Sequence, residues 1–84
     1  MAKKYTGLLE AVAEECERRG EVYDELTRRV AVAYLDEMVP ALARNLRISE
    51  AGAYKTYVSR HVAAVTTAVT RMRAEVSELM EPAE

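Results

Sequence analysis

The sequence predicts an all-α fold, a small bundle of three to four helices with a long C-terminal helix, in a chain that forms a dimer. Apolar residues recur at helical spacing through most of the 84 residues. A repeat of alternating three- and four-residue steps, typical of helices packed along their length, also extends over residues 48–79. The positions of this repeat, of which only the lysine is not apolar, are Ile48, Ala51, Lys55, Val58, Val62, Val65, Val69, Met72, Val76 and Leu79.

The first helix is expected over residues 6–19. Thr6 is a suitable N-cap because its hydroxyl can accept a hydrogen bond from the first turn. Gly20 follows the last helical residue, where the left-handed conformation that ends many helices favours glycine. The apolar stripe of this helix consists of Tyr5, Leu8, Leu9, Val12, Ala13 and Cys16.

The second helix is expected over residues 21–38, followed by a short helix over residues 40–46. Residues 30–35 are apolar all round, which is typical of a central helix with neighbours on two sides. Pro40 lacks the N–H that would bond four residues back, and it disfavours the helical state of the preceding residue. Two alternatives stay open: the helix either kinks at Pro40 or ends there.

The last helix is expected over residues 49–80, with Ser49 as its N-cap and Pro82 just beyond its end. Such a helix spans about 45 Å, whereas residues 6–19 span only about 20 Å. The earlier helices are therefore too short to cover it, which predicts self-association. Residues 62–70 are rich in β-branched side chains, so a strand is the local alternative, but the three-four spacing favours a helix.

Small side chains line the back of this last helix, where an isolated coiled coil would carry charges. They allow another helix to approach closely, so the helix is predicted to be the spine of a bundle, with its uncovered part from about Val65 to Leu79 binding a partner. The small residues are Ser49, Ala53, Thr56, Ala63, Ala64, Thr67, Thr70 and Ala74. The predicted oligomer or partner interface consists of Val58, Val62, Val65, Val69, Met72, Val76 and Leu79.

Size and composition predict a single domain over residues 1–84. A domain of this size buries only about 60% of its unfolded surface, so oligomerisation is the expected extra source of stability. Cys16 and His61 are the only cysteine and histidine, which excludes an intramolecular disulfide and argues against a zinc site. A lone thiol suits a reducing compartment, and no segment has the length and apolarity of a signal sequence or membrane span. We therefore expect a cytoplasmic protein without membrane contact.

The net charge of −2 is distributed unevenly. Residues 5–40 carry −5, residues 41–73 carry +5, and residues 74–84 carry −4. Such asymmetry can mark a polyanion-binding face. The alternative is that the basic middle pairs with the acidic ends, within the chain or across a dimer. The excess of nine arginines over three lysines suggests a GC-rich bacterial or phage source.

Catalytic residues are scarce. Cys16 and His61 lie forty-five positions apart without a flanking nucleophile motif, and Cys16 falls on the apolar stripe of its helix. The carboxylates have neither EF-hand nor Glu-x-x-His spacing, and the three glycines form no phosphate-binding loop. We therefore expect no enzyme, no cofactor and no metal.

Residues 41–60 carry the strongest functional pattern. A short helix, a tight connection near Arg47 and a second helix capped by Ser49 resemble the helix-turn-helix of many bacterial regulators. The positions that match the first half of this pattern are Ala43, Leu46, Ile48 and Ser49. The chain departs from it at Arg47, where the pattern usually has glycine, and at Glu50, which opens the presumed recognition helix.

The resemblance implies contacts with DNA bases and phosphates. The candidate nucleic-acid contacts are Arg44, Arg47, Tyr54, Lys55, Tyr57 and Arg60. The alternative is a plain turn between two bundle helices, with Tyr54 and Tyr57 covering the rim of the core.

Two functions follow from these observations. The first is a small helical protein-protein interaction module, an adaptor, regulator or phage-type inhibitor that acts by docking on a protein partner as a homodimer. The second is a dimeric helix-turn-helix-like DNA-binding transcriptional regulator that uses residues 41–60.

Overall fold

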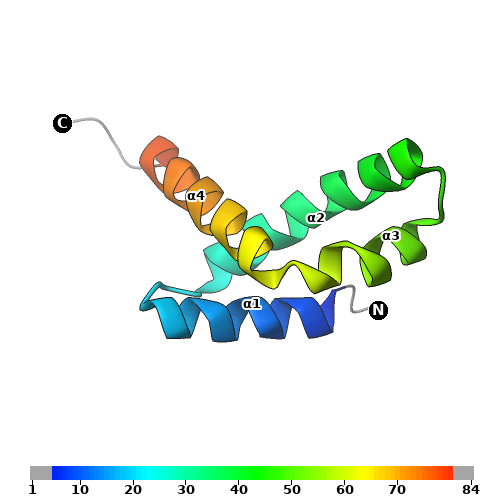
Figure 1. The fold of residues 1–84 in the computed structure, drawn as a ribbon. Coiled ribbons are helices and arrows are strands. Elements are labelled where there is room, and N and C mark those ends of the chain that lie inside the picture. Colours follow the sequence, from blue (N-terminus) through cyan, green and yellow to red (C-terminus); the bar gives the residue numbers. More distant parts are fainter. Residues whose placement is uncertain (1–4, 81–84) are drawn as a thin grey trace.

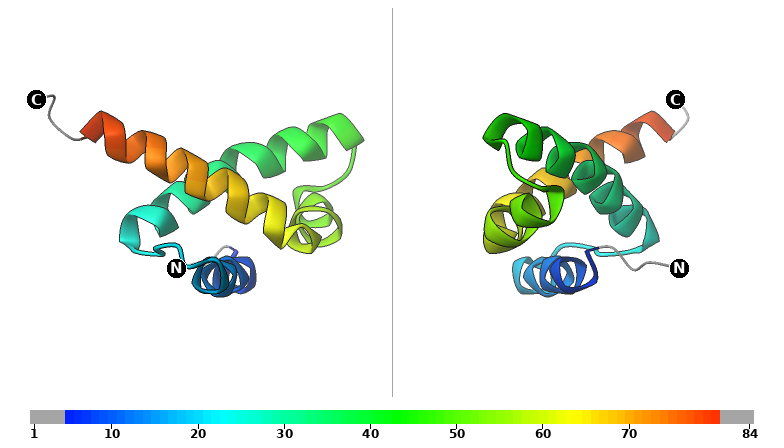
Figure 2. Two further views of the ribbon diagram at one scale, coloured as in Figure 1. Left: turned by 60° about the vertical axis from the view of Figure 1, so that its left-hand side comes forward. Right: turned by 90° about the vertical axis from the view of Figure 1, so that its right-hand side faces the viewer.

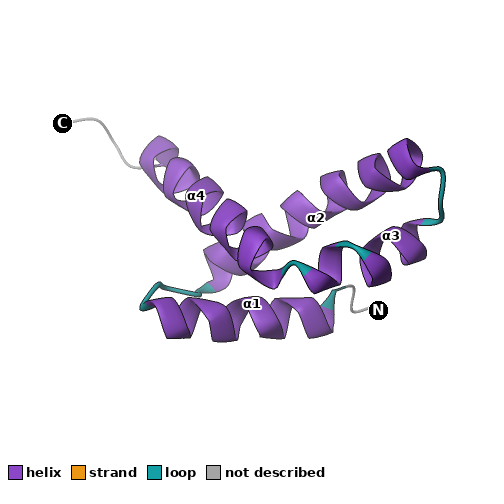
Figure 3. Cartoon of the chain, in the orientation of Figure 1, coloured by secondary structure: helices purple, strands orange, loops and turns teal. Residues whose placement is uncertain are grey.

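The computed structural model describes residues 5–80, which form four α-helices and no strand (Figures 1 and 3). This confirms the predicted all-α class. In chain order the elements are α1 (Thr6–Arg19), α2 (Glu25–Leu46), α3 (Glu50–Thr56), the short 3-10 helix η1 (Val58–Arg60) and α4 (Val62–Met80).

The two longest helices, α2 and α4, cross in the middle of the molecule, and α1 lies beneath the crossing (Figures 1 and 2). Helix α3 folds back under the C-terminal half of α2, while α4 contacts both α1 and α2. Helix α2 therefore has neighbours along both of its halves, as its all-round apolar stretch predicts. The core residues of the four helices and η1 are Leu8, Val12, Cys16, Val30, Ala31, Leu35, Val39, Ala43, Ala53, Val58, Val65 and Val69.

Helix α1 has the predicted bounds, but its start differs from the expectation. Tyr5, with φ 63°, is the N-cap in place of Thr6. At the other end Gly20 adopts the left-handed conformation, with φ 73°. The backbone N–H of Glu21 bonds to the carbonyl of Cys16 at 2.9 Å, which completes a Schellman motif.

Helix α2 begins at Glu25, four residues later than predicted, because Asp24 is its N-cap. The Asp24 carboxylate accepts a bond from the backbone N–H of Thr27 at 3.0 Å. Helix α2 then continues through Pro40 to Leu46, which decides between the two alternatives that the sequence leaves open. Val39 and Ala43 are both buried, so packing on either side of the proline holds the helix together despite the missing N–H.

The prediction of one continuous helix over residues 49–80 is wrong, because the structure divides this segment into α3, η1 and α4. Ser49 is the N-cap, and its hydroxyl accepts a bond from the Gly52 N–H at 3.0 Å, but α3 ends at Thr56. The Ser59 hydroxyl donates to the carbonyl of Lys55, and a ring nitrogen of His61 contacts the carbonyl of Tyr57. Such local side-chain bonds compete with the helix ladder. The break also turns the chain so that Ala53, on α3, and Val65, on α4, enter the same core.

Replacement of Arg47 by glycine is expected to stabilise the fold by about 0.5–1 kcal/mol, because glycine adopts a left-handed conformation without the Cβ clash. Arg47 has φ 59° and ψ 45° and follows α2 directly. The backbone N–H of Ile48 bonds to the carbonyl of Ala43 at 3.0 Å, so this turn is also a Schellman motif. Urea unfolding measures the change. Arg47→Ala is the control, since it removes the charge but keeps a Cβ, and an equal gain in this variant would contradict the explanation.

Acid is expected to weaken the start of α2. Bonds from the N–H and hydroxyl of Thr27, together with Arg73 at 2.8 Å, lower the pKa of Asp24 to about 2. Because the folded pKa lies below the unfolded value of about 4, this contribution is complete above about pH 5 and is lost as the pH falls towards 2. Bonds from Arg28 and Arg29 lower the pKa of Glu25 to about 2 in the same window.

Asp24→Asn keeps a capping oxygen but loses the charge, so its thermal stability should depend less on pH between about 5 and 2 than that of the wild type. Glu14→Gln, at an exposed position of α1, is the matched control. An identical acid-unfolding profile for the wild type and Asp24→Asn would refute the assignment.

Candidate functional site

The seven residues of the predicted partner interface divide into three groups. Val58, Val65 and Val69 are buried in the core of their own chain. The half-buried members that pack against this core are Val62, Met72 and Val76. Leu79 is 85% exposed, and α4 extends past its neighbours at that end (Figure 1). The stripe is therefore covered by the chain itself as far as Val69, and only its C-terminal end is open.

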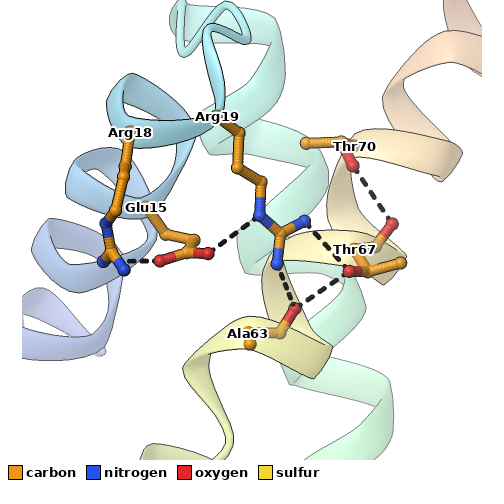
Figure 4. Close-up of polar contacts among 6 residues, drawn as sticks. All are labelled: Glu15, Arg18, Arg19, Ala63, Thr67 and Thr70. Atoms are coloured by element: carbon orange, nitrogen blue, oxygen red, sulfur yellow. Dashed lines mark hydrogen bonds and ion pairs between the residues drawn. The ribbon is translucent and has the colours of Figure 1, made fainter.

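Helix α1 contacts the back of α4 at Ala63 and Thr67, two of its small residues, through Arg19 (Figure 4). Its guanidinium bonds to the hydroxyl of Thr67 at 3.0 Å and to the carbonyl of Ala63 at 3.1 Å, from the C-terminal end of α1. Glu15 orients the same guanidinium through a 2.9 Å bond to its Nε. The predicted close approach of another helix is thus supplied within the chain at Ala63 and Thr67.

A shallow apolar groove lies where α2, η1 and α4 meet, and we call it the tyrosine groove. It encloses about 140 Å³. Its lining residues are Tyr34, Met38, Leu42, Tyr57, Val58, His61, Ala64 and Val65. The spacing of Tyr34, Met38 and Leu42 by four residues marks one face of α2 in the sequence. The opposite wall depends on the break before α4, so the sequence analysis missed the groove.

Four cations gather around the turn between α2 and α3 and along α3 and η1. We call Arg44, Arg47, Lys55 and Arg60 the basic corner. All four are exposed, and within residues 5–80 they form no ion pair. The arginines that do pair with carboxylates are Arg18, Arg19, Arg28, Arg29 and Arg73. The only acid in residues 41–60 is Glu50, so the corner carries a local excess of positive charge.

The two tyrosines among the candidate nucleic-acid contacts serve the fold at least in part. Tyr54 is half-buried, and its ring centroid lies 5.3 Å from that of Tyr5. The Tyr5 hydroxyl donates to Asp36 at 2.9 Å, and burial together with this bond raises the pKa of Tyr5 to about 12. Tyr57 lines the tyrosine groove. Tyr54 therefore joins the start of α1 to α3 rather than pointing freely outward.

The turn after α2 has the left-handed residue that the helix-turn-helix resemblance requires, and Arg47 supplies it in place of glycine. The helix that follows differs from the expectation, since α3 has only seven residues and ends at Thr56. Its first turn carries Glu50, whose charge does not favour phosphate. The turn geometry fits the motif, while the short helix departs from it.

The structure assembles no reactive site from Cys16 and His61. Cys16 is fully buried, and this burial, with a smaller effect of Glu21, raises the pKa of its thiol. His61 is exposed at the start of α4, and no hydrogen bond joins the two side chains. Across the described part of the chain, no three metal-ligating side chains come together. None of the helices within residues 5–80 has the length and apolarity needed to cross a bilayer.

Comparison with known proteins adds no relative: no family model, curated protein or solved structure matches this chain. The surfaces of this chain that could bind a partner are the tyrosine groove, the basic corner and the exposed end of α4.

Proposed function

We propose that this protein is a small helical docking module that binds an amphipathic helix with acidic flanks in its tyrosine groove, without catalysing a reaction. The observation that carries the proposal is an apolar groove on α2 and η1, which also carry Arg44 and Arg60, two cations that form no ion pair within residues 5–80. Tyr57 and His61 line the groove, and Arg60 lies between them in the chain.

The lining of the groove suits a protein partner. Tyrosine and methionine are enriched in the cores of protein interfaces, where tyrosine offers a large contact area at a low entropic cost. A volume of about 140 Å³ is close to the roughly 150 Å³ that holds a group the size of benzene. The groove therefore has room for one large apolar side chain, which is the usual anchor of a helix bound in a groove.

The basic corner selects the charge of the partner. Unpaired cations at the rim of an interface speed the approach of an acidic partner and disfavour a basic one. On α1 and α2, acidic residues already form ion pairs with arginines, for example Glu15 with Arg19 and Glu25 with Arg28. Selection by charge at this surface thus depends on Arg44, Arg47, Lys55 and Arg60.

A fluorescein-labelled helical peptide of leucine and glutamate, with leucines on one face, is the probe for this proposal. We expect it to bind the full chain at least tenfold more tightly than a matched leucine–lysine peptide, as measured by fluorescence anisotropy. Ala64→Glu places a charge in the groove at an exposed helical position and should weaken binding at least tenfold.

Ala33→Glu is the matched control, since it makes the same change at another exposed helical position, outside the groove lining. It should bind the peptide like the wild type. Equal affinity for the two peptides, or equal binding by Ala64→Glu and the wild type, would contradict the proposal.

A second candidate is DNA binding through residues 41–60, and the unpaired cations of the basic corner favour it. Phosphate contacts by lysine and arginine release counterions, so affinity for random duplex DNA should fall steeply as salt is raised. Arg44→Gln combined with Arg47→Gln should then weaken binding at low salt. Arg28→Gln combined with Arg29→Gln removes the same charge from a site paired with Glu25 and should change little. A chain that does not bind duplex DNA at about 0.05 M salt would refute this candidate.

A further inference from the structure

Within residues 5–80, five of the six exposed large apolar side chains lie either on the segment from the end of α2 to the end of α3 or at the end of α4, and the sixth, Val22, lies between α1 and α2. One set, with exposed fractions near 40%, lies around the connection between α2 and α3 and the end of α3: Leu46, Ile48 and Tyr57. At the end of α4, Leu79 is 85% and Met80 70% exposed. The C-terminal end of α4 and the α2–α3 connection lie at opposite ends in all three views, along a molecule whose longest dimension is 47 Å (Figures 1 and 2).

The charges at these two ends are opposite. The last two turns of α4 carry the acidic residues Glu75 and Glu78 and no lysine or arginine, and the sequence continues with Glu81 and Glu84. The other end carries the basic corner. Each end thus combines exposed apolar surface with a net charge, and the two charges complement each other.

The charge decides against the simplest assembly, in which the open ends of two α4 helices pair with each other. Such a pairing brings together two segments that each carry −4 over residues 74–84. Like charges that face each other across an interface are unfavourable, whereas a positive patch opposite a negative one steers association. The end of α4 is therefore suited to a basic apolar surface, which this chain itself presents where Arg60 adjoins Tyr57 and His61 of the tyrosine groove.

We infer that the occupant of the tyrosine groove is the C-terminal end of α4 from a second copy, with Leu79 or Met80 as the inserted side chain. This inference rests on the proposed function, since it uses the same groove. Glu75 and Glu78 of one copy then face the basic corner of the other. Two copies lying antiparallel exchange this contact reciprocally, which closes a two-fold dimer and leaves no open end to form a filament.

The reciprocal arrangement also increases the surface area buried between the two copies. A stable interface buries about 1,200–2,000 Å² in total. The two-fold dimer makes the end-to-groove contact twice. It covers Leu79 and Met80, the most exposed large apolar side chains of the described chain, in both copies.

Sedimentation equilibrium of the full chain at tens of micromolar tests the inference. We expect a dimer whose dissociation constant rises at least tenfold in Leu79→Asp and in Ala64→Glu but not in Ala33→Glu. Leu79 is so exposed that the circular dichroism signal of Leu79→Asp should match the helicity of the wild type, which separates lost association from lost folding.

Mixing the two weakened variants separates this dimer from a pairing of α4 with α4. Leu79→Asp keeps an intact groove and Ala64→Glu keeps an intact α4 end, so a heterodimer regains one of the two contacts. The mixture should associate more tightly than either variant alone. A pairing through two α4 ends gives no such recovery.

Salt gives a second discrimination. Between about 0.1 M and about 1 M NaCl the Debye length falls from about 10 Å to about 3 Å. Attraction between opposite charges then weakens, so the proposed dimer should dissociate more readily at high salt, whereas a pairing of acidic ends should tighten.

A wild-type chain that stays monomeric, a dimer that Leu79→Asp leaves intact, or a mixture without recovery would overturn the inference. If the chain is monomeric and still binds the leucine–glutamate peptide, the proposed docking function stands and only the identity of the occupant is wrong. If neither the peptide nor a second copy binds, the groove itself is not a docking site and both proposals fall.

Discussion

Val65→Asp is expected to unfold the chain. Val65 is buried against the core between α2 and α4, and an unpaired carboxylate there costs at least about 4 kcal/mol. A protein of this size is stable by only roughly 4–12 kcal/mol, at about 0.05–0.15 kcal/mol per residue. Circular dichroism should show lost helicity, or a steep fall in the midpoint of thermal unfolding.

Leu79→Asp is the matched control for this change. It introduces the same carboxylate on the same stripe of α4 but at an exposed position, so the helical signal should stay close to that of the wild type. If Val65→Asp folded normally and merely became monomeric, the packing of α4 against its own chain would be wrong. The comparison thus distinguishes a core valine from an interface valine, which the repeat in the sequence does not.

Leu35→Ala is expected to destabilise the fold by about 2–5 kcal/mol. Leu35 has the largest side chain among the fully buried residues and lies at the middle of α2. Its truncation removes apolar contacts and leaves a cavity that the crossing helices cannot close fully. The free energy of unfolding in urea measures the loss.

Leu46→Ala provides the comparison, because Leu46 is an exposed leucine at the end of the same helix. Its replacement should change the free energy of unfolding by no more than about 0.5 kcal/mol. Similar losses in the two variants would show that the centre of the core does not lie at Leu35.

Local chemistry allowed several elements to be predicted from the sequence. The end of α1 follows from Gly20, and the start of α3 from Ser49, because a left-handed residue and a hydroxyl cap act within one turn of the chain. The predicted start of α2 at residue 21 is four residues early, because the acidic residues Glu21, Asp24 and Glu25 all suit the first turn of a helix and do not show where it begins. Only the bonds from Thr27 to Asp24 decide this.

The break between α3 and α4 had weaker local signals. Thr56 and Val58 are β-branched, and Ser59 and His61 can bond to backbone carbonyls, but the same residues also fit a continuous stripe. A straight helix satisfies the three-four repeat locally. The bent chain instead buries Ala53, Val58 and Val65 in one core with α2. This burial depends on residues that are far away in the sequence.

The candidate site was predicted only in part for the same reason. The basic corner is readable from the sequence because four cations and one acid occupy residues 41–60. That they form no ion pair within residues 5–80 depends on the packing. The tyrosine groove requires α2 and the turn before α4 to meet, and no periodicity within either segment reveals that meeting.

The sequence by itself determined that this protein is helical, where its first helix ends, and that its charge is divided between a basic middle and an acidic end. These properties depend on spacing, capping and composition, which act over a few residues. The tertiary structure decided which part of the long valine stripe is core and which part stays open. Burial is shared among segments distant in the chain, so α1 and α2 cover the stripe as far as Val69 and leave Leu79 exposed.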